Sequence, residues 1–412
     1  MRNDELLGYA RTFGTPLYVF DGRVLERRLE RLRSALPTNV ELCYAVKANT
    51  FIVPLLAGSV ERLEACSTGE ARICLDAGAQ PDALVVSGVN KDARFMDELI
   101  GSGMPVGRYT VESRLQFDML LECARRHDVR IPVLLRLTSS NQFGLDQAEL
   151  VDIVATHGSD PNLDIWGVQY FSGTQKTSTK RLARELRQVR KVMDRLEQEC
   201  GFTCRELEFG PGFPVQYFEE DAFDEDAFLA EFASQLEDFA FDGPIILELG
   251  RSIAASCGTF LTGVADAKVN DGQRYAIVDG GMNHLVYFGQ SLAMRDPKCA
   301  LLDYEGRTVH PVEPWNVCGS LCSVNDILAK QLPFPGLEIG DVLAFENTGA
   351  YCMTEGISLF LSRELPRVCL VGGGRPDQAR ARRPAHLPPQ LPGRLGARTR
   401  GERRVLSVKP HT

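Results

Sequence analysis

The 412-residue sequence lacks features that mark several large classes of protein. It has no run of roughly eighteen apolar residues, which excludes a membrane-spanning helix. Its charged first residues lack the apolar core of a secretory signal. Its twelve cysteines are scattered without the framework of a small disulfide-rich domain. We therefore expect a cytoplasmic protein with reduced thiols and no membrane partner.

Metal and nucleic-acid binding are disfavoured by two further absences. Cys318 and Cys322 are spaced like zinc ligands, but no neighbouring pair completes a site, so no metal is expected. The chain carries a net charge of −9, and residues 372–412 contribute +8 from nine Arg and one Lys against one Asp and one Glu. The first 371 residues therefore carry −17. An acidic body argues against a nucleic-acid partner.

Between residues 23 and 265, apolar strand-like runs alternate with amphipathic helical stretches. No Gly-rich dinucleotide-binding motif opens this region, so the alternation favours a (β/α)8 TIM-like barrel over an open sheet. Helical patterns occur at 25–35, 113–127 and 180–200. The expected strands are 41–46, 83–87, 108–110, 132–137, 165–170, 206–209 and 245–248.

The sequence changes character from about residue 266. Short strand-like runs at 275–278, 342–346 and 368–371 are separated by Gly, Asn, Asp and Pro turns, which is typical of a β-domain. We assign residues 1–22 and 266–371 to this C-terminal β-domain, because 15–20 is also strand-like. Residues 372–412 are rich in Arg, Pro and Gly and are predicted to be disordered.

Lys47 stands out because it ends the apolar run at 41–46. A lysine there could extend its ammonium to solvent. If it is buried, it must be paired or chemically used, because burying an unpaired ammonium is costly and depresses its pKa. A neutral amine is the form that makes a Schiff base.

Further polar and Gly-rich stretches follow the later strands, where barrel enzymes place their chemistry. They are QYFSGTQ at 169–175, GPGFP at 210–214, ELGR at 248–251 and DGGMN at 279–283. The backbone N–H groups of the glycine turn at 210–212 could bind a phosphate, although an ordinary strand-to-helix turn has the same composition.

In their order along the chain, these stretches resemble the fold-type III pyridoxal-phosphate decarboxylases, the family of diaminopimelate and ornithine/arginine decarboxylases. The resemblance extends from about residue 12 to 371. It also implies the alanine racemase/decarboxylase-like architecture of a barrel followed by a β-domain. Six motifs carry it: YAVKAN at 44–49, NQFGL at 141–145, GPGFP at 210–214, ELGR at 248–251, CGSLC at 318–322 and ENTGAY at 346–351.

The resemblance implies pyridoxal 5′-phosphate as the cofactor and a role for each matching residue. Lys47 would form an aldimine with the cofactor, and Glu248 would face its pyridine nitrogen, keeping it protonated as an electron sink. Gly210, Gly212, Arg251 and Tyr351 would surround the phosphate, with Thr174 in support. Phe171 would stack on the ring, where the family usually has His.

Three residues of the β-domain complete the implied site. Cys322 would act as the proton donor from a second subunit, so a homodimer with shared active sites is implied. Asp326 matches another position that crosses the interface, and Ser323 lies beside the substrate. Taken singly, Glu248 could be an exposed strand-end carboxylate, and Cys322 or Tyr351 a core residue. The order of the motifs favours the functional interpretation.

Two departures from the family bear on the substrate. Ser323 stands where diaminopimelate and ornithine enzymes carry the Glu or Asp that binds a distal ammonium. Residues 284–290 lack the Arg that diaminopimelate enzymes use for a distal carboxylate, and the next arginine is Arg295. Losing both charges argues against meso-diaminopimelate as the substrate.

We therefore predict decarboxylation of an amino acid by a diaminopimelate decarboxylase-like enzyme. Two alternatives are a decarboxylase of a glutamyl-type substrate tethered to an acyl carrier protein and an amino-acid racemase on the same fold. The racemase is disfavoured because alanine racemases present Arg, where this chain has Glu248, to the pyridine nitrogen. A non-catalytic relative is a third alternative, against which Lys47 and Cys322 both argue.

Overall fold

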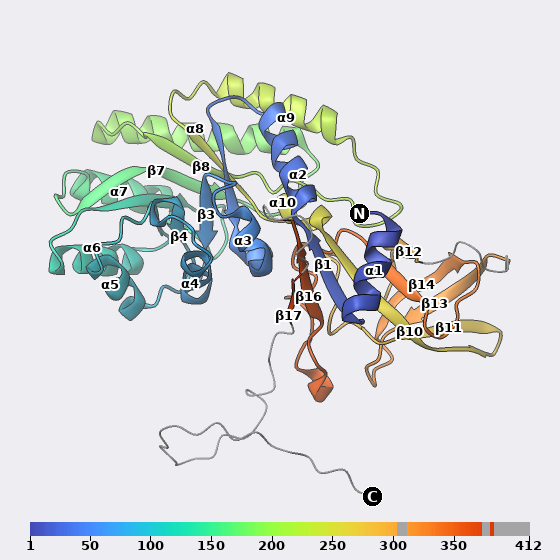
Figure 1. Ribbon diagram of the computed structural model, residues 1–412. Helices are drawn as coiled ribbons and strands as arrows, with labels where there is room; N and C mark the ends of the chain where they lie inside the picture. Colours follow the sequence, from blue (N-terminus) through green and yellow to red (C-terminus); the bar gives the residue numbers. More distant parts are fainter. Residues whose placement is uncertain (303–310, 373–379, 383–412) are drawn as a thin grey trace, which may run out of the picture.

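The computed structural model describes residues 1–302, 311–372 and 380–382. Eight parallel strands close into a barrel with helices around it (Figure 1), which confirms the predicted fold class. β9 pairs with β2 to complete the ring. The strands are β2 (Val40–Ala45), β3 (Arg62–Ala65), β4 (Leu84–Val86), β5 (Arg108–Val111), β6 (Ile131–Leu137), β7 (Leu163–Phe171), β8 (Glu206–Gly210) and β9 (Ile245–Leu249).

Most of the surrounding helices begin at polar side chains that cap their first turn. Leu25, Leu29 and Leu32 form the buried face of α2. The Ser113 and Ser178 side chains accept backbone N–H groups at the starts of α6 and α8. The helices at 25–35, 113–127 and 180–200 are confirmed. The set is α2 (Gly22–Ala35), α3 (Val53–Leu56), α4 (Thr68–Asp76), α5 (Ala93–Gly101), α6 (Arg114–Arg126), α7 (Gln147–His157), α8 (Thr179–Cys200), α9 (Glu225–Phe239) and α10 (Arg251–Ala254).

β3 is a barrel strand that the sequence pattern did not predict. It is only four residues long, and two of them, Arg62 and Glu64, are charged. Arg62 makes two hydrogen bonds to the buried Glu206 of β8, at 2.6 and 2.8 Å. Arg108 of β5 contacts the same carboxylate at 2.6 Å. The barrel interior is therefore partly ionic, which removes the apolar signal of a buried strand.

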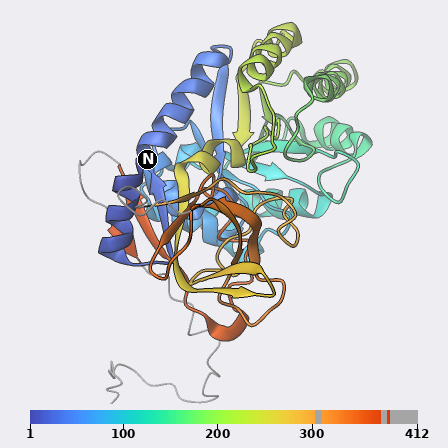
Figure 2. The same cartoon turned by 90° about the vertical axis from the view of Figure 1, so that its right-hand side faces the viewer.

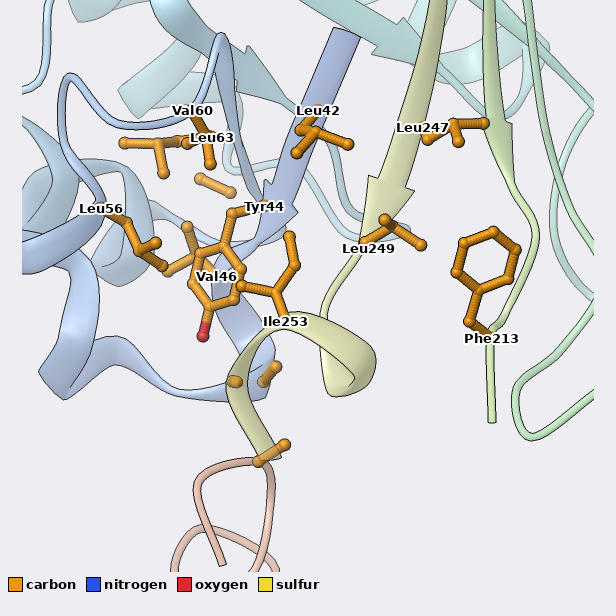
Figure 3. Close-up of a cluster of buried hydrophobic side chains, with 14 of the residues drawn as sticks. Leu42, Tyr44, Val46, Leu56, Val60, Leu63, Phe213, Leu247, Leu249 and Ile253 are labelled. Atoms are coloured by element: carbon orange, nitrogen blue, oxygen red, sulfur yellow. The ribbon is translucent and has the colours of Figure 1, made fainter. Parts of the chain in front are cut away.

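Alternate residues of β2 and β9 build the apolar layer between the barrel wall and its helices. Leu42 and Tyr44 of β2, with Val46 just beyond it, pack together with Leu56 and Leu63 (Figure 3). The opposite set of side chains includes Cys43, which packs with Val85 and Ile246 in a separate buried cluster. This alternation places Lys47 at the barrel's C-terminal mouth.

The second unit is a nine-stranded sheet, seen from its own side in Figure 2. Its strands are β1 (Leu17–Asp21), β10 (Gly258–Asn270), β11 (Gln273–Val278), β12 (Cys299–Leu301), β13 (Glu313–Cys318), β14 (Ile327–Phe334), β15 (Val342–Phe345), β16 (Arg367–Val371) and β17 (Arg380–Arg382). β1 follows α1 (Asn3–Phe13) and lies between β10 and β16. The N-terminal residues thus pair with strands that come after the barrel.

The Arg- and Pro-rich segment at 372–412, predicted to be disordered, lies mostly outside the described residues. Its described part includes β17, which pairs antiparallel with β16. All twelve cysteines are free thiols. Within the described ranges, no helix combines the length and the apolar character needed to cross a bilayer.

Candidate active site

Lys47 lies in a single 3-10 turn, Val46–Ala48, directly after β2. Its Nζ donates to Glu64 Oε2 at 2.7 Å and to Glu248 Oε1 at 3.0 Å. The Cys66 sulfur is 3.6 Å from the same nitrogen. Lys47 therefore connects the ends of β2, β3 and β9, and it is not a lysine extended to solvent.

The two carboxylates reverse the expected effect of burial on Lys47. Burial by itself lowers its pKa, but Glu248 and Glu64 outweigh it and raise the pKa of Lys47 well above its usual value. A buried lysine at this position was expected to be paired or chemically used, and Lys47 is paired with two carboxylates. A neutral amine requires a proton acceptor, and the Glu64 carboxylate lies within hydrogen-bonding distance.

Glu248 is held from both sides in the barrel mouth. Its Oε2 accepts a hydrogen bond from Gln169 Nε2 at 2.9 Å, while Oε1 faces Lys47. Burial and the neighbouring Glu64 raise the pKa of Glu248. Lys47 lowers the pKa of Glu64 despite its burial. The carboxyl of Glu248 is thus fixed in orientation and retains a high affinity for protons.

A glycine-lined cradle lies beside these charges. Gly212 has a φ of +63°, and a Cβ on it would come 2.0 Å from the Gly173 carbonyl oxygen. A Cβ on Gly210 would come 2.5 Å from Phe171. Glycine is therefore required at both positions. Their backbone can approach a ligand closely, as phosphate binding demands.

Arg251 opens α10 beside this cradle and is buried. Its Nε donates to Thr174 Oγ1 at 3.3 Å, and Nη1 donates to the Tyr217 hydroxyl at 2.8 Å. The guanidinium lies 4.5 Å from the centre of the Tyr351 ring and 4.6 Å from that of Phe288. No carboxylate among the described residues forms an ion pair with Arg251, so its charge remains available to an anion.

Tyr351 reaches the site because its loop is bound to the lysine motif. The Tyr351 N–H donates to Ala48 O at 2.8 Å, and Asn49 Nδ2 donates to Gly349 O at 2.8 Å. The motifs at 44–49 and 346–351 therefore form one unit, although 300 residues separate Asn49 from Gly349. Lys47 and Tyr351 from these motifs border the same cleft as Phe171, Glu248 and Arg251.

The residues of this cleft fit pyridoxal phosphate. The Lys47 amine suits its aldehyde, and the Glu248 carboxylate suits its ring nitrogen. The aromatic face of Phe171 suits its ring, and the Arg251 guanidinium beside the glycines suits its phosphate. The lining also includes Thr174, Gly212, Phe213, Leu249, Gly250, Ser252 and Tyr351.

The three β-domain residues that were expected to act across the subunit interface or beside the substrate do not line this cleft. Cys322 is exposed and Ser323 half-buried on the loop between β13 and β14. Asp326 is buried, and its carboxylate accepts the N–H groups of Met282 and Leu321, each at 2.7 Å. Within one chain, Asp326 therefore anchors the Cys322 loop to residues 280–282.

Sequence reasoning assigned no role to several residues that complete the site. Glu64 and Cys66 come from the missed strand β3 and the loop after it. Gln169 stands in a quoted strand-end stretch, but nothing in that stretch indicates its bond to Glu248. Tyr217 follows the glycine motif and contacts Arg251 only through the folded chain.

Comparisons with known proteins agree with this geometry. Residues 23–255 match the model of the family described as pyridoxal-dependent decarboxylase, pyridoxal binding domain. Diaminopimelate decarboxylase of Pseudomonas fluorescens is 30% identical over 84% of this chain and 85% of its own. L-glutamyl-[BtrI acyl-carrier protein] decarboxylase of Niallia circulans is 24% identical over 88% of this chain and 90% of its own.

Solved structures show the same architecture. A mutant diaminopimelate decarboxylase from Helicobacter pylori, complexed with L-lysine, has a TM-score of 0.80 and 25% identity. It covers 93% of this chain and 96% of its own. The predicted family, the decarboxylation of an amino acid and the pyridoxal phosphate cofactor are confirmed. These comparisons favour neither alternative, the carrier-tethered glutamyl substrate or the racemase. The chain belongs to the pyridoxal-dependent decarboxylase family.

Proposed function

We propose that this enzyme decarboxylates an amino acid whose distal end presents no free charge to the active site. The observation that carries the proposal is the composition of the cleft. Its charged lining residues are Lys47, Glu248 and Arg251. Each matches a cofactor position of the family, so the part of the cleft that this chain forms by itself leaves no charged residue for a substrate side chain.

The cofactor would be held by Lys47, by the cradle of Gly210 and Gly212, and by Arg251 with Tyr351. When bound, pyridoxal phosphate supplies the electron sink that accepts the electron pair left by departing CO2. Glu248 would hold a proton at the ring nitrogen, fixed in place by Gln169. Glu64 would accept the proton that Lys47 Nζ must lose before it can act as a nucleophile.

The segment after the Asp-Gly-Gly-Met motif supports the same view of the substrate. Arg295, the first arginine after it, makes ion pairs of 2.6 Å with Glu220 and 2.5 Å with Asp221. Its guanidinium also lies 4.0 Å from the centre of the Phe218 ring. The charge of Arg295 is therefore neutralised by Glu220 and Asp221 and does not serve a distal carboxylate of the substrate. Ser323 cannot pair with a distal ammonium.

The exposure of Cys322 supports a homodimer in which each β-domain completes the site of the other subunit. Ile357, Leu359, Phe360 and Leu361 form an exposed apolar run close to its loop, since Arg363 donates to Ser320 O at 2.7 Å. Covering this run would stabilise a dimer. Cys322, with Ser323 beside the substrate, would then donate its proton across the interface. Twelve free thiols support a cytoplasmic location.

A glutamyl group joined through its distal carboxyl to an acyl carrier protein is one substrate without a free distal charge. The relative from Niallia circulans is named for an L-glutamyl group on an acyl-carrier protein. The test is CO2 release by the holoenzyme from diaminopimelate, lysine, ornithine, arginine, glutamate and a glutamyl thioester. We expect release from the thioester and little from the charged amino acids. Efficient release from diaminopimelate would overturn the proposed substrate class.

A pair of variants tests the role of Ser323 in this selectivity. Ser323→Glu should raise activity on diamino acids relative to wild type, because it adds an anion beside Cys322 for a distal ammonium. Ser323→Gln adds similar bulk without charge and should not do so. Equal behaviour of the two variants would show that other residues bind the distal end.

A further inference from the structure

One face of α8 is strongly basic in a chain whose first 371 residues are acidic. The segment from Thr179 to Lys191 contains six Lys or Arg and a single acidic residue, Glu185. Four exposed cations recur at intervals of four, three and four residues, which places them on one side of the helix. They are Lys180, Arg184, Arg187 and Lys191.

These four cations have no carboxylate partner among the residues that the structure describes. Glu185 is buried and accepts hydrogen bonds from Ser172, Lys176 and Arg181. In the described part of the molecule, no carboxylate forms an ion pair with any of the four. The far end of α8 is different, since Arg195 there pairs with Glu199 at 2.7 Å. Four unpaired cations on one helix face repel each other unless an acidic partner covers them.

An apolar groove of about 310 Å³ lies beside this face, between α8 and α9. Ala183, Leu186 and Phe239 supply its apolar lining. Two cations and one carboxylate, Arg187, Arg190 and Asp238, complete its wall. Gln235 also lines it, and its buried Oε1 has no hydrogen-bond partner among the described residues. An apolar lining, a cationic side and a free acceptor suit an amphipathic acidic helix.

The basic face begins at the mouth of the active site. Arg181 Nη2 donates to Ser172 O at 3.2 Å, and Lys176 N donates to Gly212 O at 3.0 Å. The first bond joins the first turn of α8 to the loop that carries Thr174, and the second joins that loop to the glycine turn at 210–212. From Lys180 to Lys191 the helix extends about 16 Å along the outside of the barrel (Figure 1). A protein bound there would lie beside the cleft without blocking it.

We propose that the α8 face, defined as Lys180, Arg184, Arg187 and Lys191 with the adjoining groove, binds an acidic helical carrier protein that delivers the tethered amino-acid substrate. The inference rests on the proposed function, in which the distal end of the substrate carries no free charge. Complementary charge would speed the encounter and orient the carrier, while the cleft recognises the tethered group.

The experiment compares two forms of one substrate with the holoenzyme. One is a glutamyl group on an acyl carrier protein, and the other is the same group as a small-molecule thioester. Arg184→Glu/Arg187→Glu should raise KM for the carrier form by roughly 10- to 100-fold and leave the small thioester within about twofold. The matched control, Arg27→Glu/Lys330→Glu, changes the charge equally at exposed sites elsewhere and should alter neither KM.

Several results would overturn the proposal. An unchanged KM for the carrier form, or an equal loss on both substrates, would show that the α8 face does not bind the carrier. Loss of RNA binding in the α8 variant, with carrier kinetics intact, would assign the face to nucleic acid. If wild type releases CO2 from neither thioester, the proposed function fails. In that case, titration of the enzyme with unloaded carrier protein tests the α8 face separately. Binding to wild type that is lost only in the α8 variant would support the α8 face as the binding site, and no binding to wild type would overturn it.

Discussion

Replacing Glu248 by glutamine should abolish most of the decarboxylase activity while leaving the chain folded. Glu248 Oε1 is 3.0 Å from Lys47 Nζ, and Oε2 accepts from Gln169 at 2.9 Å. Glutamine preserves the shape and one acceptor oxygen. It removes the negative charge that would hold a proton at the ring nitrogen of the cofactor.

The magnitudes follow from these contacts. Loss of one fixed electrostatic group at a reacting centre typically lowers kcat by roughly 10²- to 10³-fold, or about 3–4 kcal/mol. Stability should change by only about 1 kcal/mol, because Lys47 keeps Glu64 as a partner at 2.7 Å and the repulsion between the two carboxylates disappears.

The assay is steady-state CO2 release at saturating pyridoxal phosphate, with visible absorbance confirming that the variant retains cofactor. Glu208→Gln is the matched control, since Glu208 is buried on the neighbouring strand β8 and does not line the cleft. The control should keep activity within about threefold of wild type. A comparable activity for Glu248→Gln would refute the role given to its charge.

Three further predictions concern the cradle, the barrel interior and the dimer. Gly212→Ala should weaken pyridoxal phosphate binding at least about tenfold, because its Cβ would lie 2.0 Å from Gly173 O. Gly201→Ala is the control, because Gly201 also has a positive φ but a Cβ there would meet nothing within 4 Å. Equal affinities of the two variants for pyridoxal phosphate, measured by titration, would contradict the proposed cradle. Burial raises the pKa of Glu208 well above its usual value, so the folded chain keeps a proton that the unfolded chain loses above about pH 4.5. The stabilisation from that proton is present at low pH and is lost as the pH rises above about 4.5. The free energy of unfolding of Glu208→Gln, measured by thermal unfolding, should therefore rise relative to that of wild type by up to about 1.4 kcal/mol per pH unit. A difference that stays constant with pH would contradict this. Mixing Lys47→Ala with Cys322→Ala should restore CO2 release by forming hybrid dimers with one intact site, and no recovery would argue against shared sites.

The sequence predicted the barrel well where strands are apolar on the side that faces the helices. Leu42, Tyr44 and Val46 alternate clearly, and the lysine that ends their run lies in the cleft. β3 was not predicted because a buried strand is recognised by an apolar run. Arg62 and Glu64 face a partly ionic interior, so this strand has no such run. An ion pair such as Arg62–Glu206 connects positions 144 residues apart, and no local pattern reveals it.

In the candidate site too, the sequence predicted residues within local motifs but not the contacts between distant parts of the chain. Lys47, Glu248, Arg251 and Tyr351 were predicted as site residues because their motifs keep their order along the chain, and the structure brings them to one cleft. Their partners were not predicted, since Glu64, Gln169 and Tyr217 act through contacts that exist only after folding. The sequence left the direction of the Lys47 pKa shift open for the same reason, because that direction depends on two carboxylates from other strands.

The central claim is that Lys47 carries the cofactor at the barrel mouth. The most direct test is borohydride reduction of the purified holoenzyme, followed by proteolysis and mass mapping of the pyridoxyl group. The structure predicts the label on Lys47 and its loss, with the visible absorbance, in Lys47→Ala. A label on another lysine, or one that survives Lys47→Ala, would contradict the account.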